Sequence, residues 1–257
     1  MKDGAIILLA GPGTPTNIVH NYLRTHFAIA AVIQERPVSR GEFLRRRVRR
    51  LGVWKTAGQV LFRGLMVPWL HATSQARRRA IAADFGLDDS PIAASAITPV
   101  ASVNAEETVA ALRSLEAEIV VVQGTRIIAE RVLNAVPATF INLHAGITPL
   151  YRGVHGAYWA LAEKNPQACG VTVHRVDPGV DTGGILEQGL VHPTPTDNFA
   201  TYGLLQLGAG LPLLKKAIED LQAGRSVPRP APPGPSRLWS HPTLVEYLRN
   251  RIHLGVK

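Results

Sequence analysis

The chain predicts an α/β fold, with a mostly parallel sheet flanked by helices. The first observation is an apolar, β-branched run at residues 118–122, the pattern of a parallel strand that is buried on both faces. The second is a strand-like run at residues 5–10 that leads through a Gly-rich turn into a helix-like segment at 18–26. Further strand-like and helix-like segments alternate along the rest of the chain.

The elements follow from apolar patterning and turn residues. The predicted strands are 5–10, 27–34, 92–98, 118–122, 139–143, 171–176 and 185–193. The predicted helices are 18–26, 104–115, 129–135, 156–161, 199–223 and 243–253. Glu106 and Glu107 suit the positive N-terminal end of the second of these helices. Thr196-Asp-Asn198 can cap the helix that starts at residue 199.

Two segments stand apart from this alternation. Residues 36–86 combine Arg-rich stretches with an apolar run at 53–70, which predicts two or three helices inserted between the second and third strands. Residues 226–242 contain six Pro and a Gly, the composition of an extended linker. We therefore expect one body over residues 1–223, with a helical insertion at about 36–86. A C-terminal appendage over 224–257 is expected to dock back onto it.

Composition limits the classes of protein. The 257 residues include 28 Lys and Arg against 19 Asp and Glu, a net charge of +9. Such a surplus attracts anions without choosing among nucleotides, nucleic acid and acidic lipid. The lack of a long apolar run and of a charged-then-apolar leader argues against a secreted or membrane-spanning protein. Cys169 is the single cysteine, which suits a reducing cytoplasm.

The basic segment from Arg45 to Arg79 leaves several alternatives open. It could rest on an anionic membrane surface or grip a nucleotide-linked substrate. We favour the plainer interpretation, in which its apolar side packs on the core and its arginines face water. Nucleic acid is not expected as a partner, because no binding motif or stacking aromatic pattern accompanies the charge. A homodimer also stays open.

Three polar side chains are expected to meet where strands give way to loops. Asn142 and His144 are two residues apart on a predicted strand, so both side chains point to the same face. Asp181 follows the strand at 171–176, within a turn-rich Asp-Thr-Gly-Gly sequence. This edge is a usual place for the active site of an α/β protein. Taken singly, each residue could equally have a structural role.

The order of these motifs is more specific than any one residue. The chain resembles the N-terminal catalytic domain of the folate-dependent formyltransferases, which include the glycinamide ribonucleotide, methionyl-tRNA and amino-sugar enzymes. The resemblance is close over residues 119–188 and looser over 6–33. It rests on the following elements: Asn142-x-His144, Pro149, Arg152-Gly153, Gly170-Val-Thr-Val-His174 and Asp181-Thr-Gly183.

The resemblance implies a Rossmann-like sheet, 10-formyltetrahydrofolate as formyl donor, and no metal. It assigns the catalytic roles to Asn142, His144 and Asp181. The residues expected to bind the folate are Gln123, Arg126, Ile127, Ile128, Val176, Asp177 and Val180. Those expected to bind the substrate are Gly11, Gly13, Thr14, Asn17, Arg152 and His155. His155 and His174 could instead be ordinary hydrogen-bonded polar groups, and Arg126 an ion-pair partner.

Formyl transfer to an amine passes through a tetrahedral, oxyanion-bearing carbon, and the three catalytic residues suit this chemistry. Asn142 can donate an N–H to the oxyanion. His144 can donate to the same oxygen and carry a proton. Asp181 can orient the imidazole and relay the proton of the amine. Neither a covalent nucleophile nor a metal is required.

The acceptor amine is less well specified. Gly146 stands where most relatives have Ser, and Gly184 where they have Pro, which indicates a divergent subfamily. We expect a small primary amine, foremost an amino sugar carried on a nucleotide. Glycinamide ribonucleotide is the alternative, with Thr14 and Asn17 at its phosphate.

Other acceptors and roles are less expected. Methionyl-tRNA is disfavoured because those relatives append a C-terminal barrel, and hydrolysis of the folate because those relatives carry an N-terminal regulatory domain. A non-catalytic membrane-surface or anion-binding adaptor is the distant alternative.

Overall fold

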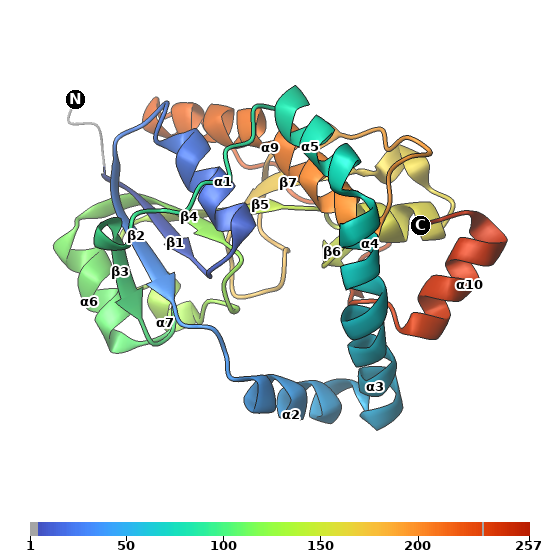
Figure 1. The fold of residues 1–257 in the computed structure, drawn as a ribbon. Helices are drawn as coiled ribbons and strands as arrows, with labels where there is room; N and C mark the ends of the chain where they lie inside the picture. Colours follow the sequence, from blue (N-terminus) through green and yellow to red (C-terminus); the bar gives the residue numbers. More distant parts are fainter. Residues whose placement is uncertain (1–4, 233) are drawn as a thin grey trace.

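A seven-stranded sheet runs through the computed structural model, which describes residues 5–232 and 234–257. The strand order is β3-β2-β1-β4-β5-β7-β8 (Figure 1). Strands β1 to β5 are parallel, and β7 is antiparallel to both β5 and β8. The predicted α/β fold with a mostly parallel sheet is therefore confirmed. The bounds are β1 Ala5–Ala10, β2 Ile29–Glu35, β3 Ile97–Val100, β4 Ala117–Gln123, β5 Thr139–His144, β7 Gly170–Arg175 and β8 Ile185–Leu190.

Helices cover both faces of the sheet. Along β1, Ile6 and Leu8 pack in a cluster with α1 and α9, whereas Ile7 and Leu9 pack with α6 and α7. Because both faces of β1 are buried, its sequence is continuously apolar. The flanking helices are α1 Thr14–Leu23, α6 Glu106–Ser114, α7 Glu130–Leu133, α8 Gly156–Ala162 and α9 Phe199–Gln222. No helix in the described ranges is long and apolar enough to cross a membrane.

Some predicted bounds are wrong for identifiable reasons. Helix α1 begins at Thr14 rather than at residue 18, because Pro15 is compatible with the first turn of a helix. Strand β8 ends at Leu190, where its partner β7 begins with Gly170. Two short strands were not predicted, β6 Tyr151–Gly153 and β9 Arg237–Trp239, which pair with each other in parallel.

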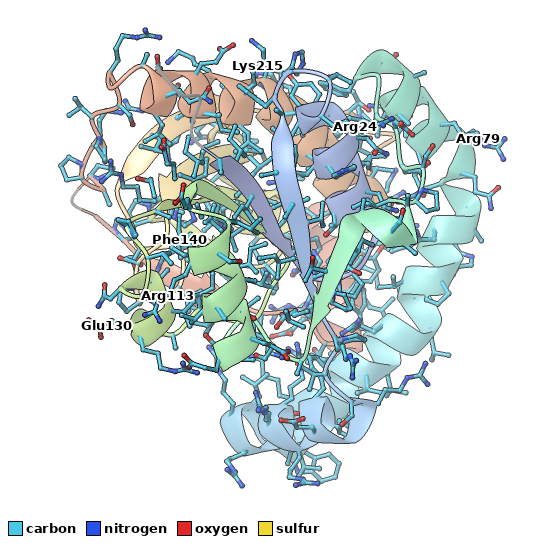
Figure 2. The ribbon with its side chains drawn as sticks, turned by 90° about the vertical axis from the view of Figure 1, so that its left-hand side faces the viewer. Arg24, Arg79, Arg113, Glu130, Phe140 and Lys215 are labelled. Atoms are coloured by element: carbon cyan, nitrogen blue, oxygen red, sulfur yellow. The ribbon has the colours of Figure 1, made fainter. Side chains whose placement is uncertain are left out.

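The helices predicted between the second and third strands are present. They are α2 Arg40–Leu51, α3 Val53–Leu61, a π-helical turn at Phe62–Met66, α4 Val67–Thr73 and α5 Gln75–Asp84. Phe62 anchors this insertion, since its fully buried ring lies 4.8 Å from Phe199 and 5.0 Å from Tyr247. Helix α2 lies away from the sheet (Figure 1). Figure 2 shows that Arg79 on α5 and Glu130 on α7 lie at opposite sides of the molecule.

The C-terminal segment contacts the body at several places. The backbone of Arg229 exchanges two hydrogen bonds of 2.8 Å with Ile185, which extends the edge of the sheet. Helix α10, Leu244–Leu254, buries Tyr247 completely, and Asn250 donates to the Tyr158 hydroxyl at 3.0 Å. The division of the chain near residue 223 stays a prediction.

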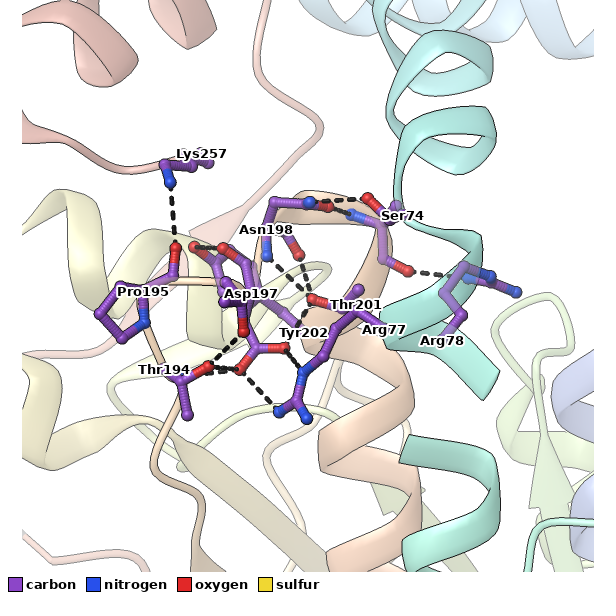
Figure 3. A network of polar contacts seen from close by, with 12 residues as sticks. Ser74, Arg77, Arg78, Thr194, Pro195, Asp197, Asn198, Thr201, Tyr202 and Lys257 are labelled. Carbon is purple, nitrogen blue, oxygen red and sulfur yellow. Dashed lines mark hydrogen bonds and ion pairs between the residues drawn. The ribbon is translucent and has the colours of Figure 1, made fainter. Parts of the chain in front are cut away.

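A buried carboxylate joins the insertion to the start of α9 (Figure 3). Asp197 is fully buried and accepts from Arg77 at 2.8 Å and 3.0 Å, and from the backbone N–H of Thr194 at 2.8 Å. Asn198 next to it caps α9 and donates to Ser74 on the insertion at 2.7 Å. Burial raises the pKa of Asp197, but the bonds from Arg77 and Thr194 outweigh it, so the pKa lies below its usual range.

Arg77→Ala is expected to lower the free energy of unfolding at pH 7 by about 3 kcal/mol, because it leaves the buried Asp197 charge without its cation. Urea unfolding measures the change, and Arg79→Ala on the exposed side of α5 is the matched control. The loss should shrink below about pH 4. A depressed carboxylate pKa stabilises the fold above the unfolded value, and that contribution disappears as protonation removes the charge. Equal stability of the two variants would contradict the role of Arg77.

Candidate functional site

Strand β5 places Asn142 and His144 on one face of the sheet, as their spacing predicts. Ile141 and Leu143 point to the other face and pack in the cluster with α9. Burial of these two residues fixes the register, because a shift by one position would turn them out of the core. His144 is the last residue of the strand and is 6% exposed.

Asp181 lies between two imidazoles. Its Oδ2 atom is 3.5 Å from His144 Nδ1, and its Oδ1 atom is 3.6 Å from His174 Nε2. The backbone N–H of Gly153 donates to Oδ2 at 2.8 Å. Asp181 has a left-handed backbone, with φ of +52°, which Asp tolerates better than most residues. The structure therefore brings His144 and Asp181 together and adds His174 to them.

Hydrogen bonds assign the tautomers of the two rings. The Nδ1–H of His174 donates to the carbonyl of Arg175 at 2.7 Å, so Nε2 of the neutral ring accepts from the Asn142 amide at 3.2 Å. The Nε2–H of His144 donates to the carbonyl of Tyr151 at 2.7 Å, which leaves Nδ1 facing Asp181. A proton added to Nδ1 of His144 would therefore point at the carboxylate.

Burial and neighbouring charge shift the pKa values of His144 and Asp181 in opposite directions. Burial lowers the pKa of His144, and the Asp181 charge and the Tyr151 carbonyl offset this only in part. Burial would raise the pKa of Asp181, but the facing imidazoles of His174 and His144, which can take up a positive charge, and the N–H of Gly153 hold the pKa below its usual range. At neutral pH the site thus pairs an ionised carboxylate with a neutral imidazole able to take a proton.

Neighbouring segments hold the Asp181 loop in place. Arg152 donates to the carbonyl of Val180 at 3.1 Å, and the N–H of Val176 donates to Phe140 at 2.8 Å. Asp177 accepts from the Gly179 N–H at 3.1 Å and from the Thr182 hydroxyl at 2.7 Å, which closes the turn. The structure therefore gives Val176, Asp177, Val180 and Arg152 roles in shaping the loop, alongside the ligand contacts expected of them.

The last residue of β4 has a buried oxygen that is available to accept a hydrogen bond from a ligand. The Oε1 atom of Gln123 is buried and has no hydrogen-bond partner among the described residues. The N–H of Arg126, by contrast, donates to Glu35 at 2.7 Å, and its guanidinium forms an ion pair with the same carboxylate at 3.1 Å. Ile128 is buried in the core and Ile127 is exposed. The Arg126 amide is therefore engaged within the protein, and the ion-pair alternative describes its side chain.

The first Gly-rich loop is a tight turn. A Cβ atom on Gly11 would lie 2.3 Å from the carbonyl of Gly124, so only glycine fits there. The amides of Thr16 and Asn17 both donate to the carbonyl of Gly13, and Pro at positions 12 and 15 has no N–H. The Asn17 side chain donates to Asp89 at 3.2 Å, and Thr14 is exposed. This loop has few donors left for a phosphate.

A second cluster of polar side chains includes His155, two residues after Gly153, whose N–H donates to Asp181. We call it the Arg47 cluster (Arg47, Gln59, Arg63, His155 and His241). Arg47 donates to Gln59 at 2.6 Å and lies 3.3 Å from His241 Nδ1. The rings of His155 and His241 are 4.5 Å apart. Burial, then Arg47 and Arg63, lower the pKa of His241 to about 3. The His155 pKa also lies well below its usual value, from burial and then His241.

The two imidazoles have little contact with solvent, at 6% exposed for His144 and 2% for His174. The described cavities, of about 520 Å³ and 210 Å³, lie by the end of α10 and beside β8, and neither is lined by the three catalytic candidates. Asn142 and Asp181 are half-buried, whereas His174 is 2% exposed. A substrate would therefore meet the amide and the carboxylate first, and would reach His144 Nε2 only by replacing the Tyr151 carbonyl as its partner.

His174 was not among the expected catalytic residues, but the structure places its ring 3.6 Å from Asp181. It pairs with Asn142 across β5 and β7. The signal was present in the strand: Thr172 and His174 alternate with Val171 and Val173, so a polar row runs along one face of a buried strand. Within the described residues, no group of three His, Cys, Asp or Glu side chains is arranged to hold a metal ion.

Asp181→Asn is expected to lower the pKa of His144 further below 6.5, because the carboxylate is the main group that opposes the effect of burial. Asn keeps an oxygen that can accept from Gly153. NMR titration of the histidine ring protons measures the shift, with exposed His192 as an internal control. A His144 pKa that rises in the variant would contradict the assignment.

Comparison with known proteins supplies the family. Among curated proteins, the methionyl-tRNA formyltransferase of Solibacter usitatus (strain Ellin6076) is 34% identical over 123 residues, which are 48% of this chain and 39% of the relative. The chain thus matches about two fifths of the length of such relatives.

Solved structures share the fold. Glycinamide ribonucleotide transformylase 1 from Symbiobacterium toebii aligns with a TM-score of 0.58 and 20% identity, over 93% of this chain and 96% of that one. The N-formyltransferase from Helicobacter canadensis in complex with folinic acid and dTDP-3-aminofucose aligns with a TM-score of 0.57 and 17% identity, over 91% and 70%. A formyl transferase family model matches residues 71–203, just over half of the chain and including Asn142, His144 and Asp181, so the chain belongs to the formyl transferase family.

Proposed function

We propose that this protein is a 10-formyltetrahydrofolate-dependent N-formyltransferase whose acceptor is a small primary amine, foremost an amino sugar linked to a nucleotide. The observation that carries the proposal is the position of Asp181 between His144 and His174, with Asn142 hydrogen-bonded to the second ring. Membership of the formyl transferase family supports the reaction class. The folate would supply the formyl group.

Different residues would accept the amine proton and stabilise the developing oxyanion. The ionised Asp181 carboxylate is half-buried and would accept a proton from the incoming amine, directly or through water. His144 and His174 both face it and can share that proton. The proton would then pass to the folate nitrogen as the bond between that nitrogen and the formyl carbon breaks. One N–H of the Asn142 amide is used by His174, so the other is available to a developing oxyanion, a contact worth roughly 3 kcal/mol in comparable sites.

The end of β4 offers one polar atom that would suit the folate. The buried Gln123 Oε1 lacks a partner among the described residues, and an acceptor in that state is costly unless a ligand donates to it. Ile128 belongs to the core cluster next to this loop, and Val176 packs against the same cluster. Together these residues would hold a ring with apolar faces and polar edges. The engaged amide of Arg126 does not contribute to this fit.

The Arg47 cluster supports an anionic acceptor such as a nucleoside diphosphate sugar. Arg47 and Arg63 are accompanied there by two neutral imidazoles and an amide, and no carboxylate hydrogen-bonds or pairs with Arg47 or His241 among the described contacts. His155 directly precedes Gly156, whose N–H donates to Ala145 beside His144. The cationic group is thus joined to the catalytic strand by a short, fixed segment.

Two other acceptors have less support. A ribonucleotide phosphate on the first loop would find that Asn17 is engaged and that two of its positions are proline. Methionyl-tRNA is the acceptor named for the curated relatives, but the match spans about two fifths of their length and therefore does not carry their substrate to this chain.

His144→Ala and Asp181→Asn are each expected to reduce kcat by about 10²–10⁴-fold, because both residues handle the proton. The assay incubates the protein with 10-formyltetrahydrofolate and a panel of amino-sugar nucleotides and glycinamide ribonucleotide, and follows a gain of about 28 Da by mass spectrometry. His192→Ala, at an exposed histidine, is the matched control. Near-normal turnover by the two variants would refute the assignment.

Arg47→Ala is expected to raise the KM for a nucleotide-linked acceptor about tenfold, with a smaller effect on kcat, because it removes a charge-assisted contact. Arg46→Ala removes the same charge from the same helix, but Arg46 is exposed and paired with Glu42, so its KM should be unchanged. Equal effects of the two substitutions would mean that the substrate senses only the overall charge.

A further inference from the structure

The positive charge of the protein comes from one segment. Residues 40–79 contain eleven arginines and lysines and a single acidic residue, Glu42, a net charge of +10. The rest of the chain has 17 basic and 18 acidic residues and is close to neutral. A charge of this size confined to a few helices creates a local positive potential that favours an anionic surface.

Helix α2 has no buried residue, although Ser39 caps it and the helix spans twelve positions. Arg45, Arg46, Arg49 and Arg50 are all exposed on it. Phe43 and Leu44 are also exposed, at 41% and 45%. Since most helical stability comes from packing an apolar face, a helix without buried residues is expected to have a partner outside the chain.

The helices that follow α2 carry an exposed apolar stripe, which we call the Trp54 face (Trp54, Leu61, Leu65 and Trp69). Their spacing of seven, four and four residues places them along one side of the helical column. Trp54 is 88% exposed, and the others are 48–61% exposed. The polar Thr56 and Gln59 are instead buried. In α3 the amphipathic pattern is therefore inverted relative to an ordinary surface helix, whereas the apolar Phe62 and Leu70 are buried further along the column. An exposed apolar patch of this kind marks an interaction site.

We propose that α2 and the Trp54 face form a docking surface for an anionic lipid membrane. Tryptophan and leucine enter the boundary between headgroups and acyl chains, while flanking arginines bind the phosphates of acidic lipids. A second copy of the chain would bring two strongly positive surfaces together. Nucleic acid would pair with the arginines but leave the leucine stripe exposed to water.

Vesicle sedimentation with the full chain tests the surface. The protein should bind vesicles of phosphatidylcholine with added phosphatidylglycerol and not vesicles of phosphatidylcholine alone. Replacing Arg45, Arg46, Arg49 and Arg50 by Gln should weaken binding on the order of a hundredfold. Trp54→Ser with Leu65→Ser should weaken it at least about tenfold, by loss of apolar burial. Val245→Ser with Ile252→Ser, at two residues of α10 that are 74% exposed, is the matched control and should bind normally.

Tryptophan fluorescence provides an independent readout. Anionic vesicles should shift the emission to shorter wavelength, and Trp54→Phe should reduce that shift, with Trp69 contributing the remainder. Absence of binding to anionic vesicles at low salt would overturn the proposal, as would binding that the Trp54 and Leu65 substitutions leave unchanged. Self-association that Trp54→Ser abolishes would assign the surface to a second copy instead, and displacement of bound vesicles by duplex DNA would assign it to nucleic acid. None of these outcomes depends on formyl transfer.

Discussion

A single carboxylate held between two buried imidazoles is the contact on which the rest of the site depends. Asp181 has a left-handed backbone, and its side chain is 13% exposed between the two rings. The N–H of Gly153 and the bond from Arg152 to Val180 fix that loop from the opposite side. The short pairing of β6 with β9 in turn fixes Gly153. The geometry of the candidate site is thus stabilised by β6 and β9, which lie outside the seven-stranded sheet.

The glycine at position 146, where the family resemblance leads us to expect Ser, has a structural explanation. A Cβ atom on Gly146 would lie 2.7 Å from Nε2 of His144 and 2.3 Å from the Tyr151 carbonyl. The hydrogen bond between those two groups therefore requires glycine there, whereas a serine would have to displace the ring. The same hydrogen bond makes the His144 ring less accessible and leaves Asp181 as the more exposed proton acceptor.

Apolar runs and turn residues were sufficient to predict the strands, the layer arrangement and the inserted helices, because burial on both faces leaves a direct trace in the sequence. The convergence of His144 with Asp181 followed from the motif order. Strands β6 and β9 escaped, since three-residue strands that pair across more than eighty positions have no local pattern. The exposure of Trp54 and Leu65 was not predicted either, because the helical spacing of apolar residues is the same whether they face the core or a partner.

The pH dependence of kcat for formyl transfer tests the central claim most directly, because it reports the protonation of the His144–Asp181 pair, in which both pKa values are lowered. Burial lowers the pKa of His144, so the neutral ring should persist below pH 6.5, and the acid limb of the profile should lie below that value. An acid limb at or above pH 6.5, or a profile unchanged by Asp181→Asn, would contradict the account.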